Sequence, residues 1–191
     1  MLAPPTERPV RRALFVDRDG TLNPDLHYLK EAERIELFRG VGRALVLARE
    51  HGYLVVCVTN QSGIGRGHYS HDDVHRMHAR LNERLASEGA RIDAFYYCPH
   101  TPEEQCRCRK PATGLFEDAR RDWNIDFAGS AVVGDRALDA QAGRRLGLLT
   151  ALVGRPGHGE ALAAELTASG TSVDILTGAF EPAVARILAR G

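Results

Sequence analysis

The chain alternates short apolar runs with longer amphipathic stretches. Apolar runs that end in polar residues or glycine are typical of strands buried in a parallel sheet. Such runs predict strands at 13–17, 54–60, 92–98, 130–135 and 148–154, and a shorter run lies at 173–176. Amphipathic stretches with end signals predict helices at about 41–52, 70–88, 115–123, 137–147 and 179–190, with one more in the alanine-rich tail. The polar residues 22–39 predict an irregular segment.

This alternation determines the expected fold class. Strands followed by helices of about ten residues or more imply right-handed crossovers and a parallel sheet with helices on both faces. We therefore predict an α/β fold, a Rossmann-like three-layer sandwich with a mainly parallel sheet. No insertion is large enough to form a large cap domain. Residues 13–191 are expected to form a single domain after a flexible N-terminal leader at 1–12.

Composition excludes several classes of partner. The 191 residues carry 25 basic and 25 acidic side chains, a formal net charge of zero. A protein that binds the nucleic-acid backbone should be basic, so we expect no nucleic-acid partner. No apolar run approaches the roughly 20 residues that cross a bilayer, and we expect no membrane association. Without an export signal the cytoplasm is the expected location, and without a spare apolar stripe we expect a monomer.

Two carboxylates follow the first predicted strand. Asp17 and Asp19 are two residues apart, and side chains at this spacing project toward the same side of a strand. Gly20 lets the backbone turn away at once. Parallel sheets bind ligands beyond the carboxyl ends of their strands, which is where this pair is expected. Taken alone, the segment could also be an ordinary turn rich in aspartate.

Groups suited to phosphate and metal follow the other strands. The second strand ends in residues 59–63, T-N-Q-S-G, whose hydroxyls and backbone N–H groups can bind phosphate oxygens. The fourth ends in Asp135, which with Asp17 would form a site of hard oxygen ligands for Mg²⁺. Lys110, in the loop after the third strand, would neutralise carboxylate and phosphate charge. Each of these features alone has an ordinary structural explanation.

Together, these residues resemble the motif pattern of the haloacid dehalogenase superfamily of phosphatases. The resemblance runs from Phe15 to Asp139, and the D-x-D-G-T segment is its most specific part. It implies in-line attack on phosphorus by one aspartate, while the other acts as general acid and then general base. The implied catalytic residues are Asp17, Asp19, Thr59 and Lys110. The implied Mg²⁺ ligands are Asp17, Asp135 and the backbone carbonyl of Asp19.

Soft metal ligands crowd into the loop after the third strand. They are Cys98, His100, Cys106 and Cys108. Three thiols and one imidazole suit a closed, tetrahedral, structural Zn²⁺ site. A redox pair is the alternative, but it leaves the imidazole and the third thiol unexplained. The metal would fix the loop so that Arg109 and Lys110 enter the pocket in one geometry.

The sequence C-P-H followed by C-x-C-R-K-P resembles a zinc-bearing branch of this superfamily, which contains D-glycero-D-manno-heptose bisphosphate phosphatases and histidinol phosphatases. The heptose enzymes share N-x-D-x-x-Y, here Asn23, Asp25 and Tyr28, and T-N-Q-S-G-I-x-R-G, here residues 59–67. The resemblance implies Mg²⁺-dependent removal of the 7-phosphate from a heptose 1,7-bisphosphate, a small phosphorylated metabolite. Implied substrate-binding residues are Asp25, Tyr28, Asn60, Gln61, Ser62, Arg109, Lys110 and Arg136.

Three alternative functions stay open at this point. Histidinol-phosphate hydrolysis is the first. A polynucleotide 3′-phosphatase is the second, because such enzymes resemble this chain in T-N-Q-x-G-I-G-R-G and R-K-P-x-x-G. The zinc ligands and the neutral charge count against it. A non-catalytic zinc module is the third, and it would not need acidic and basic groups at converging loop ends.

Three histidines share one face of the second predicted helix. His71, His75 and His78 have the i, i+4 and i+7 spacing that could bind a metal. Their neighbours in the sequence are aspartate, arginine and asparagine, and no other motif points there. We therefore expect a solvated helix face.

Overall fold

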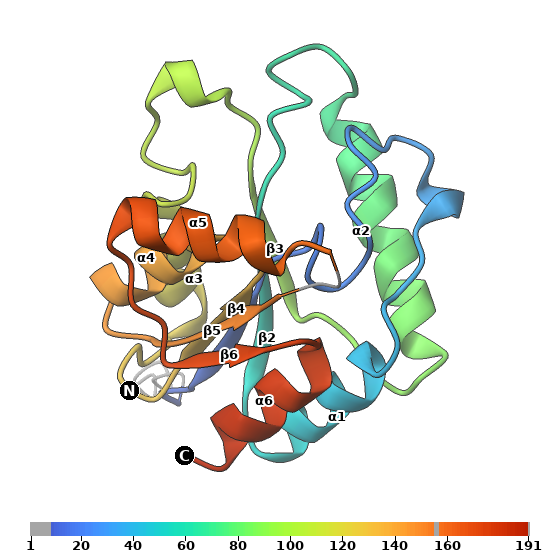
Figure 1. The fold of residues 1–191 in the computed structure, drawn as a ribbon. Coiled ribbons are helices and arrows are strands. Elements are labelled where there is room, and N and C mark those ends of the chain that lie inside the picture. The colour runs from blue at the N-terminus through green and yellow to red at the C-terminus, as the bar shows by residue number, and fades with distance from the viewer. Residues whose placement is uncertain (1–8, 155–156, 191) are drawn as a thin grey trace, which may run out of the picture.

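Six strands alternate with six helices in the computed structural model, which describes residues 9–154 and 157–190 (Figure 1). The strands are β1 (Ala13–Val16), β2 (Leu54–Asn60), β3 (Ala94–Cys98), β4 (Ala131–Gly134), β5 (Leu149–Val153) and β6 (Ile175–Thr177). The helices are α1 (Val41–Glu50), α2 (His71–Ala86), α3 (Gly114–Trp123), α4 (Ala137–Arg145), α5 (Gly159–Ser169) and α6 (Phe180–Leu188). Short 3₁₀ turns, η1 (Ala32–Arg34) and η2 (Pro102–Glu104), interrupt two loops.

The strands form one parallel sheet in the order β3-β2-β1-β4-β5-β6. Val16, at the end of β1, lies opposite Cys57 of β2 and Val133 of β4. From β1 the chain passes through β2 to β3 at one edge of the sheet. It then returns to β4 beside β1 and passes through β5 to β6 at the other edge. A crevice for ligands is expected beyond the carboxyl ends of the strands where the order reverses. The predicted α/β class and parallel sheet are confirmed.

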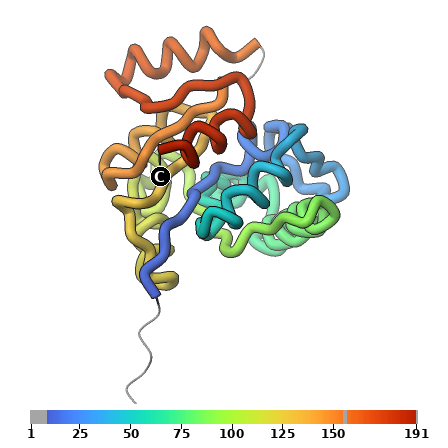
Figure 2. The backbone as a smooth tube through the Cα atoms, turned by 90° about the horizontal axis from the view of Figure 1, so that it is seen from below, coloured from blue at the N-terminus to red at the C-terminus, as the bar shows by residue number. Residues whose placement is uncertain are grey.

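Side chains of β1 alternate between the two faces of the sheet. Leu14 and Val16 join a core cluster with residues of α1, α2 and α6, whereas Ala13 and Phe15 pack with residues of α3 and α4. Helices on both faces complete the predicted three layers. Figure 2 shows that the elements at the two edges of the sheet lie apart. The orange and red C-terminal elements are above, and the green α2–β3 segment is below and to the right.

The helix predictions hold, with small shifts at the ends. The most specific is the start of α2, where Ser70 and Asp73 form the predicted capping box. Between β1 and α1 the chain forms only η1, so the described residues contain no large cap, as predicted. No described helix is long and apolar enough to cross a membrane.

Most of the predicted leader lies outside the described residues. Within its described part, the Arg11 backbone bonds with Asn124 and Asp126, and the Arg12 guanidinium lies 4.4 Å from the ring centre of Tyr53. The single-domain boundary at residue 13 therefore stays a prediction.

The prediction of a solvated histidine face on α2 is wrong for His78. Its side chain is 6% exposed and stacks on Phe95 of β3, with ring centres 4.3 Å apart. His71 and His75 are exposed, and both bond with the Tyr97 hydroxyl at 2.9 and 3.0 Å. The reason is packing, because α2 lies with this face against the aromatic side chains of β3.

Candidate active site

The ends of β1, β2 and β4 and the loop after β3 enclose a pocket of about 230 Å³. Every residue predicted to act in catalysis, substrate binding or Mg²⁺ binding lines it. These are Asp17, Asp19, Asp25, Tyr28, Thr59, Asn60, Gln61, Ser62, Arg109, Lys110, Asp135 and Arg136. The structure thus brings together segments that lie far apart in the sequence. The roles of the individual residues stay predictions.

A buried lysine with two carboxylates forms the floor of the pocket. The Lys110 ammonium lies 2.6 Å from the Asp17 carboxylate and 2.6 Å from that of Asp139, and it donates to the Val58 carbonyl at 2.7 Å. Gly134 makes room for this arrangement, because a Cβ there would lie 2.3 Å from the Asp139 carboxyl carbon. Asp139, left without a role in the sequence, is therefore part of the charged floor.

The charges of these groups are strongly coupled. Burial raises the pKa of Asp17 to about 8; Lys110 opposes the rise, and Asp139 and Asp135 add to it. Burial also opposes the charge on Lys110, but Asp139 and Asp17 outweigh it and hold the pKa of Lys110 above its ordinary value. A divalent cation beside Asp17 would favour its ionised form.

The donor set fits Mg²⁺. Asp17, Asp135 and Asp139 are three buried carboxylates beside one buried ammonium group, and the Thr21 hydroxyl donates to Asp135 at 3.3 Å. Magnesium prefers carboxylate oxygens together with water and phosphate. A divalent cation would also balance carboxylate charge that a single lysine does not. The residues needed to hold the ion are therefore present.

Asp19 lies at the wall of the pocket rather than on its floor. Its carboxylate accepts hydrogen bonds from Arg18, Asn23 and Gln61. Burial raises the pKa of Asp19, but the Arg18 guanidinium, followed by the Asn23 and Gln61 amides, holds it below its ordinary value. Sequence reasoning missed Arg18, because a side chain between two strand-end aspartates is expected to point to the other face.

Asn60 fixes the backbone of Lys110. Its side-chain oxygen accepts from the Lys110 N–H at 3.0 Å, and its amide donates to the Lys110 carbonyl at 3.2 Å. Nearby, the Thr59 hydroxyl accepts from the Gln61 amide at 2.9 Å. Residues at the end of β2 thus organise the pocket as well as line it.

The two predicted substrate arginines lie nearer the rim. Arg109 donates to the His100 carbonyl at 3.2 Å, which attaches it to the cysteine-rich loop. Arg136 is 54% exposed, and its Nε lies 2.7 Å from Glu165 of α5. A second hollow, of about 220 Å³, lies between Arg136 and α5 and shares Asp25, His27, Asp135 and Arg136 with the main pocket.

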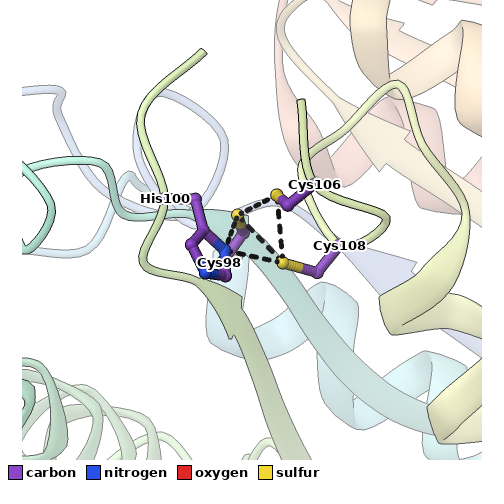
Figure 3. A group of neighbouring side chains, drawn as sticks. All are labelled: Cys98, His100, Cys106 and Cys108. Carbon is purple, nitrogen blue, oxygen red and sulfur yellow. Dashed lines mark hydrogen bonds between the residues drawn. The ribbon is translucent and has the colours of Figure 1, made fainter. Parts of the chain in front are cut away.

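The four predicted soft ligands meet in one cluster (Figure 3). The three Sγ atoms lie 3.2–3.5 Å apart, and His100 Nδ1 lies 3.2 Å from Cys108 Sγ and 3.6 Å from Cys98 Sγ. All four cysteines of the chain are free thiols. A tetrahedral Zn²⁺ with bonds of about 2.3 Å would separate sulfur atoms by roughly 3.8 Å. The donor set therefore suits a structural zinc ion, and the sulfur atoms would move slightly apart to hold it.

Comparisons with known proteins agree on one family. A family model described as HAD-hydrolase-like matches residues 107–182. The D-glycero-beta-D-manno-heptose-1,7-bisphosphate 7-phosphatase of Haemophilus ducreyi is 42% identical over 154 residues, which cover 77% of this chain and 85% of the relative. The D-glycero-alpha-D-manno-heptose-1,7-bisphosphate 7-phosphatase of Burkholderia mallei is 42% identical over 149 residues, 74% of this chain and 79% of the relative.

A solved structure resembles the whole described fold. It is the D,D-heptose 1,7-bisphosphate phosphatase from B. bronchiseptica, crystallised in complex with magnesium and phosphate. It superposes with a TM-score of 0.82 at 28% sequence identity, and the match covers 94% of this chain and 99% of the other.

Proposed function

Because the chain belongs to the haloacid dehalogenase-like hydrolases and is a phosphatase, we propose that it removes the 7-phosphate of D-glycero-D-manno-heptose 1,7-bisphosphate through an aspartyl-phosphate. One observation carries the proposal: Asp17 lies on the floor of a polar pocket with its carboxylate 2.6 Å from Lys110. The substrate in this proposal is taken from the names of the relatives. The pocket contains Asp25, Tyr28 and residues 59–62, which belong to the motifs by which the sequence resembles the heptose enzymes.

The first step forms a bond between an Asp17 oxygen and phosphorus while the bond from phosphorus to the sugar oxygen breaks. Asp19 reacts in its protonated form, which the hydrogen bonds to its carboxylate disfavour in the free enzyme, and gives the proton to that leaving oxygen, which becomes the sugar hydroxyl. Lys110 favours the ionised, nucleophilic form of Asp17 and neutralises charge on the phosphoryl oxygens. Mg²⁺, held by Asp17 and Asp135, would supply further positive charge at the phosphoryl group when bound.

The second step returns the enzyme to its starting state. The ionised Asp19 takes a proton from water, and the water oxygen forms a bond to phosphorus while the Asp17–phosphorus bond breaks. Inorganic phosphate leaves, Asp17 is again a carboxylate and Asp19 again carries a proton. Hydroxyl and backbone N–H groups of residues 59–63 are suited to bind the phosphoryl oxygens throughout.

Zinc at the cysteine–histidine cluster has a mechanical role in this proposal. Arg109 and Lys110 directly follow the ligand Cys108, and Arg109 also bonds to the backbone of the ligand His100. A fixed loop therefore delivers both cations to the pocket in one geometry. A zinc ion held here would take no part in the chemical steps, because its four protein ligands would leave no coordination position open.

A phosphate-release panel tests the proposal. Purified protein with Mg²⁺ is given heptose 1,7-bisphosphate, histidinol phosphate and a 3′-phosphorylated oligonucleotide. We expect a clear preference for the heptose bisphosphate, and the loss of turnover in Asp17→Asn while Asp72→Asn, an exposed carboxylate on α2, stays active. Preference for either other substrate would overturn the substrate assignment. Full activity of Asp17→Asn would overturn the mechanism.

A further inference from the structure

The Asp19 carboxylate is saturated with hydrogen bonds from the protein. One oxygen accepts from Arg18 Nε at 3.0 Å and from Asn23 Nδ2 at 3.1 Å. The other accepts from Arg18 Nη2 at 2.7 Å and from Gln61 Nε2 at 2.8 Å. A carboxylate has about four acceptor sites. All of them are therefore occupied, although the side chain is 26% exposed to the pocket.

Arg18 supplies two of these four bonds. Its residue is 2% exposed, and its guanidinium grips Asp19 with two parallel N–H donors, an arrangement that fixes orientation as well as distance. Nη2 also donates to Gln61 Oε1 at 3.0 Å. A buried guanidinium is tolerated only where its charge is paired. Arg18 therefore needs the Asp19 carboxylate to balance its charge, and Asp19 needs the Arg18 guanidinium to fix its orientation.

Gln61 uses its whole side chain within the protein. Its nitrogen donates to Asp19 and to the Thr59 hydroxyl, and its oxygen accepts from Arg18 and, at 2.8 Å, from the Tyr69 hydroxyl. A primary amide has two donors and two acceptor sites. Nothing is left to bind a substrate oxygen. The amide instead joins Asp19 to the loop that carries Tyr69.

We propose that Arg18 and Gln61 are positioning residues that hold Asp19 in one orientation for proton transfer, and that Tyr69 extends this support to the loop between β2 and α2. The inference rests on the proposed role of Asp19 as acid and base. Gln61, predicted from the sequence to bind substrate, acts here through Asp19 instead.

The saturated carboxylate has a further consequence. Asp19 can carry a proton only if one donor withdraws, because all acceptor sites are filled. We expect Asn23 to be that donor, because its amide is uncharged, unlike the Arg18 guanidinium, and its Nδ2 already has a second acceptor in the Pro24 carbonyl at 2.9 Å. The two bonds from Arg18 and the one from Gln61 then keep the orientation during transfer.

The test compares substrates that differ in their need for a proton. An alkyl phosphate has a poor leaving group and depends on the general acid, whereas an aryl phosphate such as p-nitrophenyl phosphate does not. General acid catalysis contributes on the order of 10²- to 10⁴-fold. For Arg18→Met and Gln61→Met we expect kcat/KM to fall about 10²-fold more on the alkyl than on the aryl phosphate. Tyr69→Phe removes one hydroxyl, and its kcat/KM should fall about fivefold more on the alkyl than on the aryl phosphate.

Matched controls separate positioning from general damage. Arg49→Met removes another guanidinium paired with two oxygens of one carboxylate, Asp93, outside the pocket. Tyr96→Phe removes a hydroxyl bonded to Asp122. Both should affect the two substrates equally. If Arg18→Met does not fold, Gln61→Met and Tyr69→Phe decide the outcome.

Asp19→Asn distinguishes the two ways in which the idea can fail. If this variant loses the same factor on both substrates, the proposed acid role of Asp19 is wrong. If it is selective while Arg18→Met and Gln61→Met lower both activities equally, the acid role stands and the positioning proposal is wrong. Selective losses in all three variants support both.

Discussion

The candidate active-site pocket and the cysteine–histidine cluster are built in opposite ways. Charged groups of the pocket floor come from positions 17, 110, 135 and 139, and the sheet brings them together. The cluster takes its four side chains from residues 98–108, which are the last residue of β3 and the loop that follows it. The first arrangement exists only if the whole fold exists. The second needs little more than one loop and a metal ion, since a bound metal contributes folding free energy to its own site.

The two regions meet at Lys110. Its ammonium belongs to the pocket through Asp17 and Asp139, whereas its backbone follows Cys108 by two residues. Asn60 holds that backbone from the side of the sheet. A metal ion bound in the cluster would therefore influence a charge arrangement that the global fold maintains.

Replacement of Lys110 should produce the largest effect. In Lys110→Met the buried carboxylates of Asp17 and Asp139 lose their cation, and removal of one partner from a buried ion pair costs about 3–5 kcal/mol. We expect a loss of this size in the free energy of unfolding, measured with denaturant, together with loss of phosphate release. Lys30→Met, at an exposed position, is the control. A stable Lys110→Met would show that the pocket does not depend on this charge balance.

Removal of zinc should affect the loop more than the sheet. In Cys108→Ser, or after chelation, residues 98–110 should lose protection from amide hydrogen exchange while β1, β2 and β4 keep theirs. A displacement of about 1 Å at Lys110 can cost about 10²-fold in turnover, so kcat/KM should fall by about this factor. Cys57→Ser, outside the cluster, should keep its zinc and its loop. Equal loss of protection in sheet and loop would contradict the contrast between the two regions.

The sequence predicted both regions, but in different detail. The alternation of apolar runs located the strands, and strand ends in a parallel sheet must share one edge, so the membership of the pocket followed from topology. The cluster followed from ligand type and short spacing alone. Arg18 was missed because its contact with the neighbouring Asp19 depends on side-chain direction. Tyr69 and Glu165 were missed because their partners, Gln61 and Arg136, are not their neighbours in the sequence. His78 was misassigned because polar neighbours in the sequence do not reveal which helix face meets β3.

The third prediction concerns how the stability of the protein changes as the pH falls, because His78 is buried. Burial lowers the pKa of His78 to about 3, and its Nε2 has no hydrogen-bond partner among the described residues. An unfolded histidine titrates near 6.5. Unfolded chain therefore binds the proton first, and stability that is present above pH 6.5 is lost as pH falls from 6.5 toward 3. By pH 5 the wild type should lose about 2 kcal/mol from this group.

The measurement is the free energy of unfolding of the wild type and His78→Phe between pH 7.5 and pH 5. The variant keeps a ring against Phe95 and should lose about 2 kcal/mol less over this range. His75→Phe, at an exposed position on the same helix face, is the matched control and should follow the wild type. Parallel curves for the wild type and His78→Phe would refute the role of His78.

The smallest effect on activity is expected at the rim of the pocket. The Arg136 side chain there is held neither by the core of the sheet nor by the loop at residues 98–110. Arg136 is partly neutralised by Glu165, an exposed pair worth at most about 1 kcal/mol. In Glu165→Gln the guanidinium should attract an anionic substrate more strongly, so KM should fall by up to about fivefold while kcat and stability stay nearly constant. Glu181→Gln, which releases Arg43 far from the pocket, should change neither constant. A lower kcat in Glu165→Gln would mean that the rim takes part in the chemistry and that the pocket extends to α5.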